Sequence, residues 1–306
     1  MADLGSALHK GIIAASPTPL MDDLSVDHDM LTEHCAWLLA NGCSGIAPLG
    51  TTGEANSFSV MERSKLLEKL VISGIPAERL IAGTGCCAIP DTVQLTKHAL
   101  RLGVTTVLVL PPFYYKSVGE DGLFDAFDRI IQQVADKRLK MILYHYPKVS
   151  GIPVTRGLIE RLLAAYPGTV AGMKDSGGDW TFTKENCALF NDFKIYSGSE
   201  THLLDNLTAG GAGSISATLN VTCKLAAELV AKRQTDQAPV LQERLAKIRG
   251  VIERYPLVAA LKHIMAIRAN HRQWTRTRPP LSVLTNKDSF DLEQALTAIE
   301  FDYSAR

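Results

Sequence analysis

The feature that most constrains the fold is a strand–helix alternation that runs through most of the chain. Each short apolar run, rich in β-branched residues, ends in Gly, Pro, Ser or Thr, and a helical stretch follows it. Successive runs start roughly 20 to 40 residues apart, which is the length of one strand–helix unit. Continuous apolar runs such as VTTVLVLPP are typical of parallel strands that helices cover on both faces. We predict eight strands, at residues 11–18, 43–49, 80–84, 105–110, 140–146, 170–174, 194–197 and 213–218.

The stretches between these strands carry signals for the ends of helices. Asp27 is a candidate N-cap, and Ser59 with Glu62 three residues later has the pattern of a capping box. We expect Asp91 to open a third helix. A glycine follows each of these stretches and supplies the left-handed residue that ends a helix: Gly42, Gly74 and Gly103.

Two α/β architectures fit eight alternating strands and helices. A doubly wound sheet usually carries a Gly-x-Gly-x-x-Gly turn after its first strand, and the segment SPTPLMDD has none. A (β/α)8 TIM barrel fits the strand count better. From about residue 223 the pattern is helical only. We therefore predict a barrel over residues 1–222, with the last barrel helix and a C-terminal helical extension at 223–306 in the same folding unit.

Composition excludes several classes of protein. Lys plus Arg and Asp plus Glu each number 32, so the formal net charge is zero. That balance argues against a nucleic-acid partner and against a polybasic membrane surface. The N-terminus lacks the pattern of a secretory signal, and no apolar window is long enough to span a bilayer. We expect a cytoplasmic enzyme.

The six cysteines match no zinc or Cys-x-x-Cys spacing. We therefore expect no metal site, and thiols that are reduced and buried. The adjacent Cys86 and Cys87 are read as small-residue packing.

Active groups of a barrel lie at the carboxyl ends of its strands, so the polar residues there are the candidates. The second run ends in LGTTGE, where the hydroxyls of Thr51 and Thr52 and nearby amides form either an anion cradle or a tight turn. The sixth run carries Lys174 inside an apolar strand. Loss of solvation there favours a neutral, nucleophilic amine that can form a Schiff base. An ion pair, for example with Asp175, is the alternative.

Aromatic residues end two further strands. Alternation puts Tyr144 and Tyr146 on one face of the fifth strand and His145 on the other. A phenol near a Schiff-base lysine can relay protons, or it can simply pack. His145 points away from the Tyr144 face, which favours a structural role. The fourth strand ends in PPFYYK, a cluster suited to a lid, a subunit contact or core.

The order of these motifs resembles the dihydrodipicolinate synthase / N-acetylneuraminate lyase family of class I, Schiff-base pyruvate aldolases. Gly-Thr-Thr-Gly-Glu, Pro-Phe-Tyr-Tyr, Tyr-x-x-Pro and Gly-Met-Lys-Asp-Ser end successive strands, and Tyr-Ser-Gly and GGAGSIS follow them. The resemblance covers the chain from about residue 10 to the Arg-Pro-Pro near residue 280. It implies a (β/α)8 barrel with a helical extension, usually in a homotetramer built from dimers.

The resemblance also implies roles for individual residues. Lys174 matches the Schiff-base lysine and Tyr144 the tyrosine that relays protons. Thr52, with the backbone amides near Gly50, would hold the pyruvate carboxylate, and Thr51 would link Tyr144 into the relay. The remaining matches are Tyr114, which enters the relay of a neighbouring subunit in many members, and Gly198 and Ile215, which line the pyruvate end of the pocket.

One departure bears on the substrate. Synthase members typically follow the Tyr-Asn-x-Pro motif with an arginine, two residues on, that binds the carboxylate of aspartate semialdehyde. Here that position is Val149, which cannot make a bidentate carboxylate contact. Lys148 is adjacent, but on strand alternation it would point elsewhere. An apolar residue before Ser-Gly is closer to the lyase side of the family.

The loops after the sixth and seventh strands carry polar groups suited to a hydroxylated substrate tail, although helix capping explains some of them equally well. These groups are Ser176, Asp179, Ser199, Glu200 and Thr201. We expect a class I lyase that cleaves or forms a 2-oxo acid, with pyruvate and an aldehyde as partners and no cofactor beyond the imine on Lys174. The alternatives are the synthase itself with its carboxylate contact moved, a Schiff-base dehydratase of a deoxy-oxo sugar acid, and a non-enzymatic relative.

Overall fold

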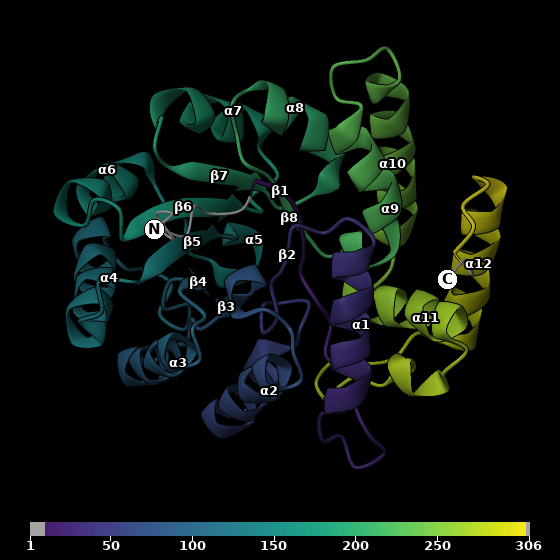
Figure 1. Ribbon diagram of the computed structural model, residues 1–306, viewed down its shortest axis with the longest axis horizontal. Helices are drawn as coiled ribbons and strands as arrows, with labels where there is room; N and C mark the ends of the chain where they lie inside the picture. The colour runs from purple at the N-terminus through teal and green to yellow at the C-terminus, as the bar shows by residue number, and fades with distance from the viewer. Residues whose placement is uncertain (1–9, 304–306) are drawn as a thin grey trace.

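Eight parallel strands form the centre of the molecule (Figure 1). The structure, a computed structural model, describes residues 10–303. The strand order is β2-β1-β8-β7-β6-β5-β4-β3, and a parallel bridge between Ile46 and Leu80 joins the two ends of the sheet. The predicted (β/α)8 barrel is therefore confirmed, as are all eight strands. Their bounds are β1 Gly11–Ala14, β2 Gly45–Ile46, β3 Ile81–Gly83, β4 Thr106–Val109, β5 Lys140–His145, β6 Val170–Asp175, β7 Lys194–Ser197 and β8 Gly213–Ser216.

The helices alternate with these strands and surround them (Figure 1). Along the barrel they are α1 His28–Ala40, α2 Val60–Ile72, α3 Ile89–Arg101, α4 Glu120–Val134, α5 Pro147–Ser150, α6 Arg156–Ala165, α7 Trp180–Leu189, α8 Leu203–Thr208 and α9 Leu219–Ala231. The extension contributes α10 Ala238–Ile252, α11 Leu257–Ala269 and α12 Asn286–Ala298. Short 3-10 turns occur at η1 Ala55–Ser57, η2 Ala77–Arg79, η3 Glu200–His202 and η4 Arg272–Thr275.

The predicted helix starts are right in two of three cases. Asp27 accepts a hydrogen bond from the Met30 amide, and Ser59 and Glu62 form both bonds of the capping box. Asp91 does not open α3, because that helix starts two residues earlier with Pro90 in its first turn. Proline suits that position, since its missing amide hydrogen has no partner at a helix start in any case.

The apolar core has an inner and an outer layer. The inner layer fills the barrel with side chains that include Ile13, Ile81, Ile142, Tyr144 and Tyr196. The outer layer packs the helices against the strands. Because the barrel interior is filled, the open space for a ligand lies at the ends of the strands rather than along the barrel axis.

The C-terminal extension packs beside α9 and contacts the carboxyl end of the barrel. Helix α10 lies against α9 and η3, and α11 lies against η4 and α9. A separate apolar cluster, which includes Ile248, Leu261 and Leu292, joins α10, α11 and α12. Figure 1 shows these three helices gathered at one side of the barrel. The extension is thus placed to form part of a wall above the strands.

Two further predictions concern membrane-spanning segments and the burial of the cysteines. Residues 1–9, which begin the segment without a secretory pattern, and residues 304–306 of the extension lie outside the described part. In residues 10–303, no helix has the combination of length and hydropathy that crossing a bilayer requires. No cysteine is in a disulfide; Cys35, Cys43 and Cys223 are buried as expected. Cys86 and Cys187 are half-buried. Cys87 is exposed on the loop before α3, so the packing expected for it is wrong.

Candidate active site

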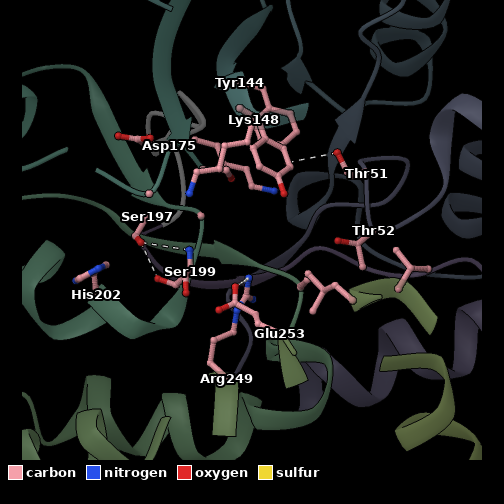
Figure 2. A pocket seen from close by; sticks show the side chains of 18 of the residues that line it. Thr51, Thr52, Tyr144, Lys148, Asp175, Ser197, Ser199, His202, Arg249 and Glu253 are labelled. Atoms are coloured by element: carbon pink, nitrogen blue, oxygen red, sulfur yellow. Dashed lines mark hydrogen bonds and ion pairs between the residues drawn. The ribbon is translucent and has the colours of Figure 1, made fainter. Parts of the chain in front are cut away.

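A cavity of about 480 Å³ opens at the carboxyl ends of the strands (Figure 2). Residues from the barrel strands, the loops that follow them and the C-terminal extension line it. Eleven of the residues singled out from the sequence line this cavity: Thr51, Thr52, Tyr144, Tyr146, Lys148, Lys174, Asp175, Ser176, Asp179, Gly198 and Ser199. The sequence motifs at the ends of β2, β5, β6 and β7 therefore contribute residues to the same cavity.

Lys174 lies on β6 between Tyr144 on β5 and Tyr196 on β7, in register with both. Its side chain is buried, with the residue 4% exposed, and its Nζ lies 4.4 Å from the centroid of the Tyr144 ring. The structure records no hydrogen bond or ion pair between Lys174 and any other residue of the described chain. A buried amine that is not tied up in an ion pair remains available to a carbonyl carbon.

Asp175, the ion-pair partner considered for Lys174, faces the other way. Its carboxylate accepts hydrogen bonds from the Gly177 amide at 2.9 Å and from the Thr183 hydroxyl at 2.7 Å. It also lies 4.0 Å from His145 Nε2. Successive side chains of a strand point to opposite faces, which separates Asp175 from the lysine beside it. The ion-pair interpretation of Lys174 with Asp175 is therefore wrong.

Tyr144 and Thr51 bring two hydroxyl groups together at the cavity. The Tyr144 Oη and the Thr51 Oγ1 are 3.4 Å apart, and Figure 2 shows the two residues facing one another. Tyr146 stacks on Tyr144 with ring centroids 5.8 Å apart, which confirms that the two tyrosines share a face. Burial, with a smaller contribution from Tyr144, raises the pKa of Tyr146.

The loop that carries Thr51 and Thr52 is a compact turn. The Glu54 amide donates to the Thr51 carbonyl at 3.1 Å, and the Ala55 amide donates to the Gly50 carbonyl at 3.2 Å. Thr52 is 6% exposed, whereas Thr51 is exposed beside Gly50 in a narrower pocket that also contacts Tyr144. The tight turn is present, and it places both threonines on the cavity, so it is compatible with an anion cradle.

His145 has a structural environment, as alternation favoured. Its Nδ1 accepts a hydrogen bond from the Val154 amide at 3.0 Å, and its ring stacks on Phe182 with centroids 5.1 Å apart. Burial lowers the pKa of His145, although the nearby Asp175 opposes the shift. A neutral ring that accepts a backbone hydrogen bond holds the segment after β5 in place.

Five of the candidate residues do not line the cavity: Gly50, Tyr114, Glu200, Thr201 and Ile215. Glu200 is fully buried, and its carboxylate accepts hydrogen bonds from the hydroxyls of Ser216, Thr218 and Thr222. It therefore stands behind the cavity wall and not on its surface. Ile215 is buried in the inner layer of the barrel. Tyr114 is 73% exposed on the loop after β4, in edge contact with Tyr115.

Gly198 explains how the loops after β6 and β7 approach one another. A Cβ atom on this residue would lie 2.1 Å from the Ser176 Oγ and 2.7 Å from the Asp175 carbonyl oxygen. Any larger residue would force the two loops apart. Glycine at this position keeps Ser176 and Ser199 together on one side of the cavity.

The sequence did not identify several residues that line the cavity, among them Trp180, His202, Arg249 and Glu253. Arg249 and Glu253 reach it from α10, and they are paired at 2.6 Å between the guanidinium and carboxylate groups. Arg249 also donates to the hydroxyls of Ser216 and Thr218 at 3.1 and 3.0 Å. The i,i+4 spacing of Arg249 and Glu253 predicts that the two side chains form an ion pair on a helix. It does not predict which part of the barrel that helix covers.

The side chain of Lys148 points in a different direction from the one predicted. Strand alternation was expected to turn it away, but β5 ends at His145 and Pro147–Ser150 form the helical turn α5. On a helical turn the side-chain directions no longer alternate. Lys148 lines the cavity, while Val149 is 53% exposed and is absent from the lining of the cavity.

The fold and this cavity define a (β/α)8 barrel with a buried lysine beside a tyrosine at the carboxyl ends of its strands. Comparison with known proteins identifies the family of this chain. A sequence model of the dihydrodipicolinate synthetase family matches residues 8–299, and the chain belongs to this family. Members of the family are carbon–carbon lyases, and this chain is an enzyme of that kind.

Individual relatives cover nearly the whole chain. An uncharacterized DapA-like lyase of Chloroflexus aurantiacus is 35% identical over 292 residues, which is 95% of this chain and 97% of the relative. The 4-hydroxy-tetrahydrodipicolinate synthase of Rhizobium meliloti is 30% identical over 293 residues, 94% of this chain and 98% of the relative. The crystal structure of dihydrodipicolinate synthase from Agrobacterium tumefaciens has a TM-score of 0.88 at 30% identity, covering 94% and 99% of the two chains.

Proposed function

We propose that the protein is a class I lyase that cleaves or forms a 2-oxo acid, with pyruvate as one partner, through an imine on Lys174. The observation that carries the proposal is the buried Lys174 amine, free of ion pairs in the described chain and 4.4 Å from the centre of the Tyr144 ring. The candidate substrates are 2-oxo-3-deoxy sugar acids, 4-hydroxy-2-oxo acids and N-acetylneuraminate.

In the cleavage direction, the Lys174 Nζ attacks the C2 carbonyl carbon and water leaves, which gives a protonated imine. The C3–C4 bond then breaks, and its electron pair moves toward the imine to give an enamine. As the aldehyde forms, the Tyr144 oxygen takes the proton of the C4 hydroxyl and passes its own proton through the Thr51 hydroxyl to solvent. A proton returns by the same route to C3. Hydrolysis of the imine releases pyruvate and restores the amine. The imine is the electron sink, so this chemistry needs no metal or other cofactor.

Hydroxyl groups and backbone amides supply the remaining functions. Thr52 and the amides beside Gly50 hold the pyruvate carboxylate, and Thr51 orients the Tyr144 hydroxyl that lies 3.4 Å away. Gly198 and Ile215 shape the pyruvate end of the pocket, Gly198 at its surface and Ile215 from the layer beneath. Ser176 and Ser199 contact the rest of the substrate.

Tyr114 acts in a different way, because it lies outside the cavity of its own chain. We propose that this exposed residue enters the proton relay of a neighbouring subunit within a homotetramer. Its contact with Tyr115, at 5.2 Å between ring centroids, presents two aromatic faces together. Paired exposed aromatic rings are typical of contacts between protein subunits.

The synthase reaction is the second candidate function. The 30% identity to the Rhizobium meliloti synthase favours it, whereas Val149 disfavours it because an apolar side chain at that position cannot bind a carboxylate. A Schiff-base dehydratase is the third candidate, since the same imine acidifies C3 of a deoxy-oxo sugar acid without cleavage of a carbon–carbon bond.

Borohydride reduction in the presence of pyruvate tests the imine directly. We expect a pyruvate-derived mass on Lys174 that the Lys174→Ala variant lacks, and the absence of an adduct on the wild-type protein would rule the proposal out. A panel of 2-oxo-3-deoxy acids, scored for pyruvate and for dehydrated product, separates lyase from dehydratase. Turnover with pyruvate and aspartate semialdehyde would identify the synthase.

A further inference from the structure

Lys148 stands out among the charged residues that line the cavity. The structure records no hydrogen bond or ion pair for its ammonium group with any described residue, although the group faces the cavity that holds Lys174 and Tyr144. Lys174 is reserved for the imine in the function proposed above. Lys148 therefore provides a positive charge at the cavity mouth that no protein group neutralises in residues 10–303.

The acidic groups around the cavity are occupied by other partners. Asp175 accepts from Gly177 and Thr183, and Asp179 caps α7 by accepting from the Thr181 amide at 2.9 Å. Glu253 is paired with Arg249. None of these carboxylates lies within ion-pair distance of Lys148, so its charge is left for a ligand.

Lys148 is exposed, and two local features place its ammonium group beside the cavity. Helical turn α5 is held at its end, because the Ser150 hydroxyl donates to the Tyr146 carbonyl at 3.0 Å and Lys116 donates to the Ser150 carbonyl at 2.8 Å. On the other side, a Cβ atom on Gly178 would lie 2.9 Å from the Lys148 Nζ. Glycine at position 178 thus leaves the space in which the ammonium lies.

The wall beyond Gly178 is flat and aromatic. Trp180 and His202 stack with ring centroids 5.1 Å apart and planes 10° apart, and both line the cavity. This surface offers packing to a carbon chain and adds no carboxylate that would compete for Lys148. The cavity, at about 480 Å³, holds a molecule considerably larger than pyruvate.

We propose that the natural substrate carries a second anionic group at the end remote from its 2-oxo acid, and that Lys148 binds this group. The inference rests on the proposed function, because it takes Lys174 as the site of the imine and Thr52 as the contact of the first carboxylate. Lys148 is then a residue that determines specificity and takes no part in bond breaking. The substrate class is a 2-oxo acid with a carboxylate or phosphate at its far end.

The test compares 2-oxoadipate with 2-oxohexanoate, which have equal chain length and differ in the terminal carboxylate. Borohydride trapping on the full chain is measured as a function of ligand concentration, by the mass added to Lys174. The proteins are the wild type, Lys148→Gln, Lys148→Arg and the control Lys184→Gln, whose lysine is exposed on α7 and away from the cavity.

We expect the wild type and the control to trap 2-oxoadipate at about tenfold lower concentration than 2-oxohexanoate, the factor expected for one charge-assisted contact. Lys148→Gln should abolish this preference and Lys148→Arg should keep it, while the half-saturating concentration of pyruvate stays the same in all four proteins. Equal trapping of both acids by the wild type, or an unchanged preference in Lys148→Gln, would overturn the inference. A weakened pyruvate response in Lys148→Gln would also overturn it, since Lys148 would then bind the first carboxylate. Failure of pyruvate itself to be trapped would instead refute the function proposed for Lys174.

Discussion

Glu54 and Lys262 form an ion pair in which both side chains are completely inaccessible to solvent. Glu54 ends the loop that carries Thr51 and Thr52, and Lys262 belongs to α11 of the extension. The same Glu54 carboxylate accepts a hydrogen bond from the Arg278 amide at 2.9 Å, and Lys262 donates to the Arg276 carbonyl at 2.6 Å. Burial lowers the pKa of Lys262, and Glu54 opposes that shift. The extension thus fixes the far end of the threonine loop.

Removal of one partner of the Glu54–Lys262 ion pair should lower the stability of the protein much more than removal of both. Lys262→Met leaves the Glu54 charge buried without compensation, so we expect the free energy of unfolding to fall by about 3–5 kcal/mol. The double variant Glu54→Gln/Lys262→Met should recover part of that loss. Urea unfolding monitored by circular dichroism measures both, and a Lys262→Met protein as stable as the wild type would contradict the arrangement.

Tyr144→Phe tests the proton relay. The variant removes the hydroxyl that lies 3.4 Å from the Thr51 Oγ1 but keeps the ring over Lys174. We expect pyruvate trapping to persist and turnover of the 2-oxo acid substrate to fall by about 100- to 10,000-fold, the range typical of a lost general acid–base group. Tyr166→Phe, which alters a hydroxyl bonded to Gln132 on the outside of the barrel, should leave turnover unchanged. Full turnover by Tyr144→Phe would remove Tyr144 from the mechanism.

Thr52→Val tests the proposed carboxylate contact. Valine has nearly the shape of threonine but cannot donate a hydrogen bond, and Thr52 is 6% exposed, so little water can replace the lost hydroxyl. We expect the pyruvate concentration that half-saturates borohydride trapping to rise by about 10- to 100-fold, as a lost bond to a charged group predicts. Thr235→Val, between α9 and α10, is the matched control. An unchanged concentration in Thr52→Val would assign the carboxylate to other groups.

His34 predicts a specific dependence of stability on pH. Burial, with a smaller contribution from Arg268, lowers the pKa of His34 to about 3, and its Nε2 lies 2.8 Å from the Asn220 Oδ1. The unfolded chain binds a proton at this residue below its ordinary pKa of about 6.5, whereas the folded chain binds it only near pH 3. The stabilisation is therefore complete above about pH 6.5 and is lost as the pH falls toward 3.

We expect His34→Gln to remove this part of the pH dependence. Between pH 6 and pH 4, the difference in unfolding free energy between the wild type and the variant should change by about 1.4 kcal/mol per pH unit, in the direction of a less stable wild type at low pH. Urea unfolding at a series of pH values measures the difference. A difference that is constant with pH would show that His34 titrates alike in both states.

The core of the site was predictable from the sequence because parallel strands impose local rules. Lys174 and Tyr144 come from strands that follow one another in the chain, and adjacent parallel strands place such residues side by side. The same rule failed for Lys148, because alternation applies only while the strand continues, and β5 ends at His145. The position of Glu200 was predicted wrongly for a different reason, because nothing near it in the sequence shows that the hydroxyls of Ser216, Thr218 and Thr222 enclose its carboxylate.

The contribution of the extension could not be predicted in this way. The pattern after residue 223 indicates helices, but the side of the barrel that they cover depends on contacts across long stretches of chain. Arg249 meets Glu200 at 3.7 Å, and Lys262 meets Glu54, across the boundary between the two regions. We propose that residues 1–222 and 223–306 are one folding unit, and we expect fluorescence and circular dichroism to report a single coincident unfolding transition.

The presence of α10 in the cavity wall has a consequence for protein engineering. Lys174, Tyr144 and the threonine pair all come from the barrel, whereas Arg249, Glu253 and Leu257 approach the same cavity from a separate stretch of the gene. A mutant library confined to the C-terminal stretch would vary the walls around a substrate while every residue proposed to form or break bonds stays unaltered. Selection for new aldehyde partners should therefore begin in the region that carries none of the recognisable catalytic motifs.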